Sequence, residues 1–208
     1  MPLLRIEKLR NGGLLGIWQM SESPTCDAGL LDEARHLYRS VARQREYVCV
    51  RLLLREMLGC HDVVIEHLAS GKPVLKGDNR TLSISHTRGY CAALLTNGRG
   101  GVDVEYRSNR VNTIAHRFLR PDEKAESTLT RLAVWSAKET MYKMFSEDKL
   151  IFEQMRIHLR TNFNGVTRQN PITTVLDGEN LYRNLRVPIT CIMNNDYVFT
   201  FSTLEEER

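Results

Sequence analysis

The 208-residue sequence has no long apolar stretch. Its longest uninterrupted run, Tyr90–Leu95, covers about six residues, whereas a membrane-spanning helix needs about 20. The N-terminal segment MPLLRIEKLR carries charges where a signal peptide would be apolar. The sequence therefore predicts a cytoplasmic protein that does not interact with membranes.

Paired cysteines are also missing. None of the five cysteines forms a CxxC pair, and their odd number does not suit a disulfide framework. They are typical of reduced, mostly buried thiols in a cytosolic protein, and no tight zinc site is expected. The five residues are Cys26, Cys49, Cys60, Cys91 and Cys191.

Neither sign of charge dominates the composition. The chain has 29 Lys and Arg against 25 Asp and Glu, a formal net charge of +4. A nucleic-acid-binding domain is usually more basic and more clustered, so no nucleic acid partner is expected. The small positive excess suits a partner that carries phosphates or an acidic surface. With 42% hydrophobic and 26% charged residues, the composition excludes a disordered chain, a collagen-like fibre and a coiled-coil rod.

The same order of elements occurs twice along the chain. Two segments with apolar residues at helical spacing fill about 29–58. The first has the stripe Leu30, Ala34, Leu37 and Val41, and the second ends at Gly59. Strand patterns follow at 82–85, 90–95 and 102–105. Helical spacing returns at about 111–119 and 122–145, before a strand at 152–159 and a hairpin formed by 187–193 and 197–202.

This repetition predicts an α+β fold of two similar subdomains in tandem, related by a pseudo-twofold axis. Each subdomain is expected to have a small, mainly antiparallel sheet packed with a long helix. The boundaries are placed at 1–100 and 101–208, with residues 97–101 as a turn or linker. The active site is expected in the cleft between the subdomains.

Two carboxylates alternate with valines in the segment Val102-Asp103-Val104-Glu105. Strand side chains alternate faces, so Asp103 and Glu105 share one face, about 7 Å apart, and can hold a hard cation between them. Taken alone, such a segment is more often a half-exposed strand with one polar face.

The segment Trp135–Lys143 carries a second group of polar side chains. On a helix, Trp135, Glu139 and Lys143 form a stripe at spacing i, i+4, i+8, beside the buried stripe. Glu139 could complete a three-carboxylate cation site, and Lys143 could meet a phosphate. Taken alone, the Glu–Lys pair is a common surface pair.

In the segment Ser83–His86, alternation with Leu82 and Ile84 predicts that Ser83 and Ser85 face outward. His86 then lies at the strand end, where hydroxyls and an imidazole can meet a phosphate. Taken alone, His86 is more often a solvated turn residue.

In chain order these segments read GKP, SISH, GVDVE, RFLRPDE and WSAKETMYK. The series resembles the 4′-phosphopantetheinyl transferase superfamily. The chain length, the doubled pattern and the GKP segment resemble its larger, pseudo-dimeric type, and the resemblance is firmest from Lys72 to Lys143. It implies transfer of 4′-phosphopantetheine from coenzyme A to a serine of an apo acyl or peptidyl carrier protein, with release of adenosine 3′,5′-bisphosphate.

The resemblance also implies roles for acids and one lysine. Asp103, Glu105 and Glu139 match the acids that bind a divalent cation, usually Mg²⁺, and ligand type does not separate Mg²⁺ from Mn²⁺. Lys143 matches the lysine near the pyrophosphate. Glu123 matches a glutamate proposed as the base, and the choice among Glu123, Glu139 and a water chain stays open.

Contacts to coenzyme A are implied in the first half of the chain. Ser85 and His86 match the pair that contacts its phosphates, and His86 could stabilise charge on the leaving phosphate. Lys72 and Pro73 match the segment beside the adenine and the 3′-phosphate. Arg45 matches a phosphate-binding arginine whose register is uncertain by a residue or so.

Two other functions stay open. A metal-dependent nuclease usually places a lysine two residues after a strand acid, but here Glu105 is followed by Tyr106 and Arg107. A non-catalytic module that binds coenzyme A or a carrier protein would keep the fold without the chemistry. For the pseudo-dimeric transferase, a monomer is expected.

Overall fold

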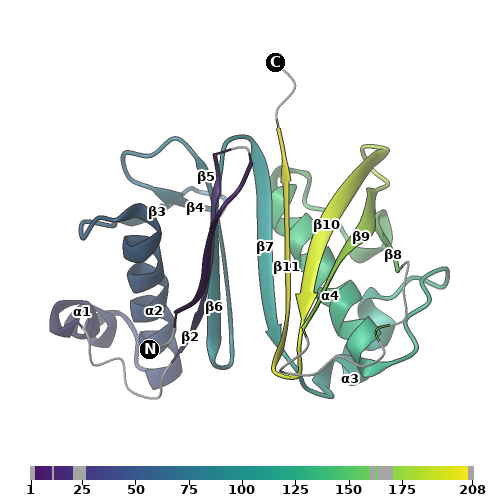
Figure 1. Cartoon of the computed structure of the whole chain (residues 1–208), viewed down its shortest axis with the longest axis horizontal. Helices are drawn as coiled ribbons and strands as arrows, with labels where there is room; N and C mark the ends of the chain where they lie inside the picture. The colour runs from purple at the N-terminus through teal and green to yellow at the C-terminus, as the bar shows by residue number, and fades with distance from the viewer. Residues whose placement is uncertain (1–2, 11, 21–26, 160–162, 164–170, 206–208) are drawn as a thin grey trace. The chain divides into compact units, whose positions relative to one another are not determined.

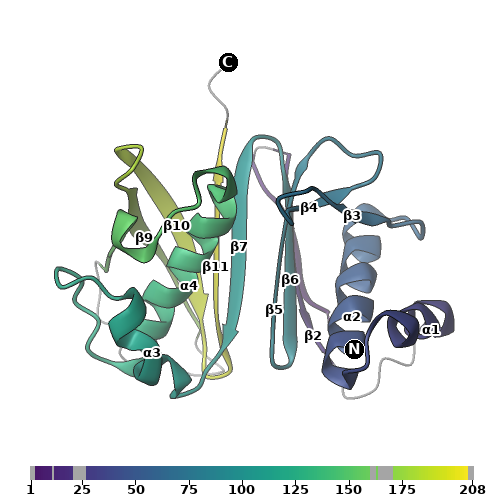
Figure 2. The same ribbon diagram turned by 180° about the vertical axis from the view of Figure 1, so that it is seen from behind.

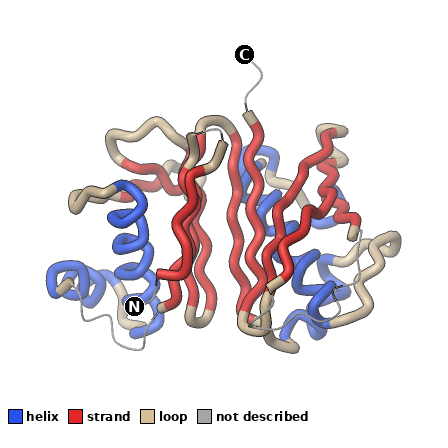
Figure 3. Tube along the Cα trace, in the orientation of Figure 1, coloured by secondary structure: helices blue, strands red, loops and turns tan. Residues whose placement is uncertain are grey.

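The structure, a computed structural model, describes residues 3–10, 12–20, 27–159, 163 and 171–205. Internal packing divides the chain into two units, Met1–Asn97 and Gly98–Arg208. Each unit contains antiparallel strands and helices, which confirms the expected α+β class (Figure 3). In the described part of the chain, no helix is both long enough and apolar enough to cross a membrane.

The first unit contains a four-stranded antiparallel sheet in the order β1-β2-β6-β5 (Figure 1). Helix α2 packs on strands β2 and β6, and α1 packs on α2. A two-stranded sheet, β3-β4, lies beside β5. The bounds are β1 (Leu3–Lys8), β2 (Leu14–Gln19), α1 (Ala28–Leu37), α2 (Val41–Leu58), β3 (Ile65–His67), β4 (Pro73–Leu75), β5 (Thr81–Thr87) and β6 (Tyr90–Thr96).

Helix α2 ends where the sequence predicts. Its C-cap residue Gly59 has φ 65°, in the left-handed region that glycine adopts at little cost. The expected apolar stripe of the preceding helix is only half buried, because α1 ends at Leu37. Leu30 and Ala34 are in the core, whereas Leu37 is 60% exposed.

The second unit contains a five-stranded antiparallel sheet in the order β7-β11-β10-β9-β8, with α4 packed against it and α3 against α4 (Figure 2). The bounds are β7 (Arg99–Tyr106), α3 (Arg110–Phe118), α4 (Thr128–Met144), η1 (Ser146–Asp148), η2 (Phe152–Gln154), β8 (Met155–His158), β9 (Ile172–Asn180), β10 (Leu185–Met193) and β11 (Tyr197–Leu204).

The contact between α4 and β7 requires a glycine at position 101. A Cβ atom on Gly101 would lie 2.1 Å from the carbonyl oxygen of Thr140, so any side chain there would push the helix away. The linker expected at 97–101 is shorter in the structure, because β7 already begins at Arg99.

Helix α4 begins later than predicted, at Thr128 rather than near residue 122. Ser127 and Thr130 form a reciprocal capping box at its start, with Ser127 Oγ accepting from the Thr130 N–H at 3.1 Å. The expected strand at 152–159 begins with a short 3-10 turn, and the predicted C-terminal hairpin is present as β10 and β11.

Most cysteines of the described residues are buried. Cys49, Cys91 and Cys191 are buried free thiols and Cys60 is an exposed one, while Cys26 lies outside the described residues. Burial raises the pKa of Cys191 to about 12 and the pKa of Cys91 well above its usual value. Neither buried thiol is suited to act as a nucleophile.

Candidate functional site

Strand β7 directs both of its acids toward helix α4. Asp103 Oδ1 accepts a hydrogen bond from Lys143 Nζ at 2.8 Å, and Oδ2 accepts one from Ser136 Oγ at 2.8 Å. Glu105 Oε1 accepts from the Trp135 indole N–H at 2.8 Å. The two acids therefore share one face of the strand, as the alternation predicts.

Glu139 lies on the same side of α4 as Trp135 and Lys143, and all three are partly buried. The pKa of Glu139 is raised to about 7, chiefly by burial, then by the negative charge of Asp103 and to a smaller extent by that of Glu105. The Lys143 ammonium acts in the opposite direction. The three carboxylates and the lysine thus form one electrostatic cluster.

The donor chemistry of this cluster suits a hard divalent cation, which prefers carboxylate oxygens. As the side chains lie in this structure, no group of three or more candidate ligands among the described residues is arranged to hold a metal ion. Asp103 and Glu105 are held by hydrogen bonds instead, and Lys143 places its positive charge on Asp103. The three carboxylates are the ligand type that such a cation prefers. In this structure the Lys143 ammonium balances the negative charge of Asp103.

A fourth acid, Glu123, makes different contacts. Its Oε2 accepts from Lys138 Nζ at 2.8 Å and from the Arg120 N–H at 2.9 Å, and its Oε1 accepts from the Ile157 N–H at 2.7 Å. The side chains of Lys138 and Glu123 are 0% and 1% exposed. This geometry gives Glu123 a structural part and offers no support for its predicted role as the base.

Lys138 was not singled out by the sequence motif, although it directly precedes Glu139. Its ammonium also donates to the carbonyl oxygens of Phe118 at 2.7 Å and Phe152 at 3.3 Å. Burial lowers the pKa of Lys138, while the hydrogen bond to Glu123 opposes this shift. The lysine therefore ties α4 to the end of α3, to the loop before α4 and to η2.

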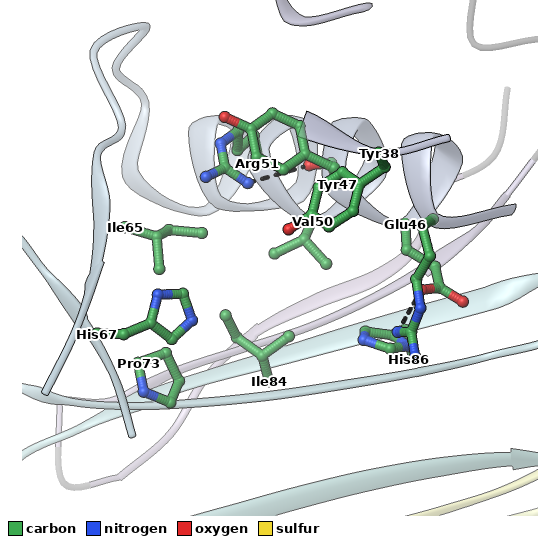
Figure 4. Close-up of a pocket in the computed structure, with 11 residues that line it drawn as sticks. Tyr38, Glu46, Tyr47, Val50, Arg51, Ile65, His67, Pro73, Ile84 and His86 are labelled. Carbon is green, nitrogen blue, oxygen red and sulfur yellow. Dashed lines mark hydrogen bonds and ion pairs between the residues drawn. The ribbon is translucent and has the colours of Figure 1, made fainter. Parts of the chain in front are cut away.

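The first unit contains a cavity of about 280 Å³ between α2, β5 and the β3-β4 sheet (Figure 4). Four cationic or titratable basic side chains line it, together with two tyrosines, one acid and an apolar floor. The lining residues are Tyr38, Arg43, Glu46, Tyr47, Val50, Arg51, Ile65, His67, Pro73, Ile84 and His86.

Arg51 is a partly buried cation that lines this cavity. Its guanidinium carbon lies 3.3 Å from the centroid of the Tyr47 ring, and Nη1 donates to the Tyr47 carbonyl at 3.3 Å. Burial lowers the pKa of Arg51. Arg43 donates to Glu46 Oε2 at 2.8 Å, and His86 Nδ1 lies 3.4 Å from the same oxygen.

The cavity brings together only some of the residues predicted to bind coenzyme A. Arg45 does not line the cavity, because Arg43, Glu46, Val50 and Arg51 follow the helical stripe that faces it. Ser85 is 6% exposed and lies on the opposite face of β5 from His86, so the two side chains do not meet in one pocket.

The outward orientation predicted for Ser83 is wrong. It is 5% exposed, because both faces of β5 are largely buried along this segment. Of the GKP segment, Pro73 lines the cavity and Lys72 does not. Arg51 and His67 were missed, although Arg51 lies at i+4 from Tyr47 and i+8 from Arg43.

Residues 99–201 match the family model described as ACPS, 4′-phosphopantetheinyl transferase superfamily. The match covers just under half of the chain and includes Asp103, Glu105, Glu139 and Lys143. These residues are thus similar to a domain of this superfamily, and the similarity points to phosphopantetheine transfer in general. No curated protein matches the chain.

Proposed function

We propose that the protein transfers the 4′-phosphopantetheine group of coenzyme A to a serine hydroxyl of an apo acyl or peptidyl carrier protein, with Mg²⁺ or Mn²⁺ as cofactor. The observation that carries the proposal is the cluster of Asp103, Glu105, Glu139 and Lys143 inside the matched residues. Three carboxylates beside one lysine suit a reaction at a highly charged pyrophosphate.

In the proposed reaction, the serine oxygen bonds to the β-phosphorus of coenzyme A, and the bond from that phosphorus to the bridging oxygen breaks. Adenosine 3′,5′-bisphosphate leaves with the electron pair. A cation held by Asp103, Glu105 and Glu139 would supply charge neutralisation at the pyrophosphate. Lys143, a flexible point charge, would stabilise the charge that develops on the leaving phosphate.

The serine proton must pass to a base in this scheme. The geometry counts against Glu123, because both of its oxygens already accept hydrogen bonds in a buried site. We therefore propose Glu139, or a water, as the acceptor. Transfer needs no covalent enzyme intermediate, so the buried thiols take no part in it.

The cavity of the first unit supports a second part of the proposal, the binding of coenzyme A phosphates and adenosine. Arg43, Arg51 and His86 supply positive or titratable groups, and Pro73 supplies an apolar edge. Burial of the Arg51 guanidinium has a free-energy cost that a bound phosphate would offset. Lys72, next to Pro73, is proposed to contact the same ligand.

We also propose that the two units descend from one repeated half, as in the larger type of the superfamily. Each unit packs one long helix against an antiparallel sheet. Helix α2 has 18 residues and α4 has 17. Both helices pack on the sheet of their own unit.

Mass spectrometry of candidate apo carrier proteins tests the proposed function. After incubation with the protein, coenzyme A and Mg²⁺, the carrier mass should increase by one phosphopantetheine group. The increase should be lost with EDTA and restored by excess Mg²⁺. Binding of coenzyme A without transfer to any carrier would favour a non-catalytic module instead.

Replacing Arg51 with glutamine is expected to weaken coenzyme A binding by about tenfold or more, because a charge-assisted hydrogen bond contributes about 1.5–3 kcal/mol. Isothermal titration calorimetry measures the affinity, and a thermal melt reports the fold. Arg39→Gln, the same change at an exposed residue outside the cavity, is the control. Unchanged affinity in Arg51→Gln would remove the cavity from the proposal.

A further inference from the structure

Three buried hydroxyl groups lie directly behind the Asp103 carboxylate. Ser136 and Thr140 are one turn apart on α4, and Thr200 is the cross-strand partner of Asp103 on β11. All three residues are 0% exposed. Ser136 Oγ lies 2.8 Å from Asp103 Oδ2 and 2.9 Å from Thr200 Oγ1, which in turn lies 2.7 Å from Thr140 Oγ1.

The Asp103 carboxylate determines which way the Ser136 hydroxyl points. An ionised carboxylate only accepts hydrogen bonds, so the Ser136 hydroxyl must donate its single hydrogen to Asp103. Thr200 can then donate to Ser136, to Oγ or to the carbonyl oxygen, each at 2.9 Å. When Thr200 donates to Ser136 Oγ and Thr140 donates to Thr200 Oγ1 at 2.7 Å, rather than to the Thr200 carbonyl oxygen at 3.3 Å, the three hydroxyls point in sequence toward Asp103.

Lys143 also holds Asp103, but it is a less permanent partner. The Lys143 side chain is 25% exposed, whereas that of Asp103 is 4% exposed. In the proposed reaction, Lys143 serves the leaving phosphate as well. The Ser136 hydroxyl is fully buried, so it holds Oδ2 in place whatever Lys143 does.

We infer that Ser136 and Thr200, supported by Thr140, are positioning residues that fix the orientation of Asp103 for a divalent cation. The inference rests on the proposed function, because it takes Asp103 as a cation ligand. Residues that hydrogen-bond to a metal ligand orient it, and their loss typically weakens metal binding by about 10–100-fold. If the hydroxyls served packing alone, their loss would change stability and leave metal affinity unaltered.

The test measures Mn²⁺ binding, by electron paramagnetic resonance of free Mn²⁺, beside urea unfolding. Ser136→Ala should weaken Mn²⁺ binding by about 10–100-fold. Thr200→Val, which removes the hydroxyl and keeps the shape, should weaken it less, because it acts through Ser136. Thr200→Ser should restore the wild-type affinity. In the transfer assay, the metal concentration for half-maximal rate should rise while kcat at saturating metal changes little.

Ser202→Ala is the matched control. Ser202 is also buried on β11, but its hydroxyl donates to the Pro188 carbonyl oxygen at 2.6 Å, away from Asp103. This variant should lose some stability and keep the wild-type Mn²⁺ affinity. If Ser136→Ala does not fold, the comparison of Thr200→Val with Thr200→Ser decides the question.

The outcomes separate this inference from the proposed function. Wild-type transfer with equal Mn²⁺ affinity in wild type, Ser136→Ala and Thr200→Val would overturn the positioning role alone. A wild-type protein that neither binds Mn²⁺ nor modifies any carrier would overturn both. Equal weakening by Thr200→Val and Thr200→Ser would also overturn the positioning role, because the serine keeps the hydroxyl.

Discussion

Replacing Glu139 with glutamine is expected to lower carrier modification by about a thousandfold, the size of effect that loss of one preorganised charge-stabilising group produces. Glutamine keeps the shape and removes the negative charge that α4 contributes to the cluster. The fold should not weaken. Burial and the nearby Asp103 charge already oppose ionisation of Glu139 and raise its pKa to about 7, so a neutral side chain relieves repulsion.

The initial rate of carrier modification, at saturating coenzyme A and Mg²⁺, measures the effect, and urea unfolding measures stability. Glu126→Gln makes the same change at an exposed position just before α4 and should leave both unchanged. Full activity in Glu139→Gln would contradict the proposed cation site. A large loss of stability would instead assign Glu139 to the fold.

The cluster on β7 and α4 could be predicted from sequence because two local periodicities determine it. Alternation places Asp103 and Glu105 on one strand face, and the helical repeat places Trp135, Glu139 and Lys143 on one helix face. Periodicity does not show that the two faces meet. Gly101 is the local signal for that contact, because a Cβ there would collide with the Thr140 carbonyl.

The outward orientation predicted for the serines of β5 was wrong, because both faces of this strand are largely buried. Alternation along β5 correctly separates Ser83 and Ser85 from Ile84 and His86. Serines were expected to mark the exposed face, but here both are buried, so polarity did not report which face meets solvent. Arg51 could have been found, since it lies at helical spacing from Arg43 on one side of α2.

The start of α4 was predicted too early for a long-range reason. Residues 122–127 directly precede the helix and have no obvious helix breaker inside them. Their conformation depends on Glu123, which turns inward to the Ile157 N–H on β8 and to Lys138 on α4. A buried contact between segments far apart in the chain does not change the hydrophobic periodicity of either segment, so the sequence pattern does not reveal it.

Replacing Lys138 with methionine is expected to lower the free energy of unfolding by about 3–5 kcal/mol. Removing one partner of a buried ion pair leaves the other charge without compensation. Glu123 is 1% exposed and would keep its charge beside an apolar side chain. Adding Glu123→Gln to this variant should therefore recover part of the stability, so the double variant should be more stable than Lys138→Met alone.

Urea unfolding of wild type, both single variants and the double variant gives the coupling free energy of the pair. Lys124→Met, the same change at an exposed lysine of the loop before α4, should alter stability little. The transfer assay on Glu123→Gln then separates two roles for this acid. A structural Glu123 predicts a loss of stability with transfer largely kept under folding conditions. Wild-type stability with transfer abolished would instead restore Glu123 as the base and contradict the structural role that its three buried donors indicate.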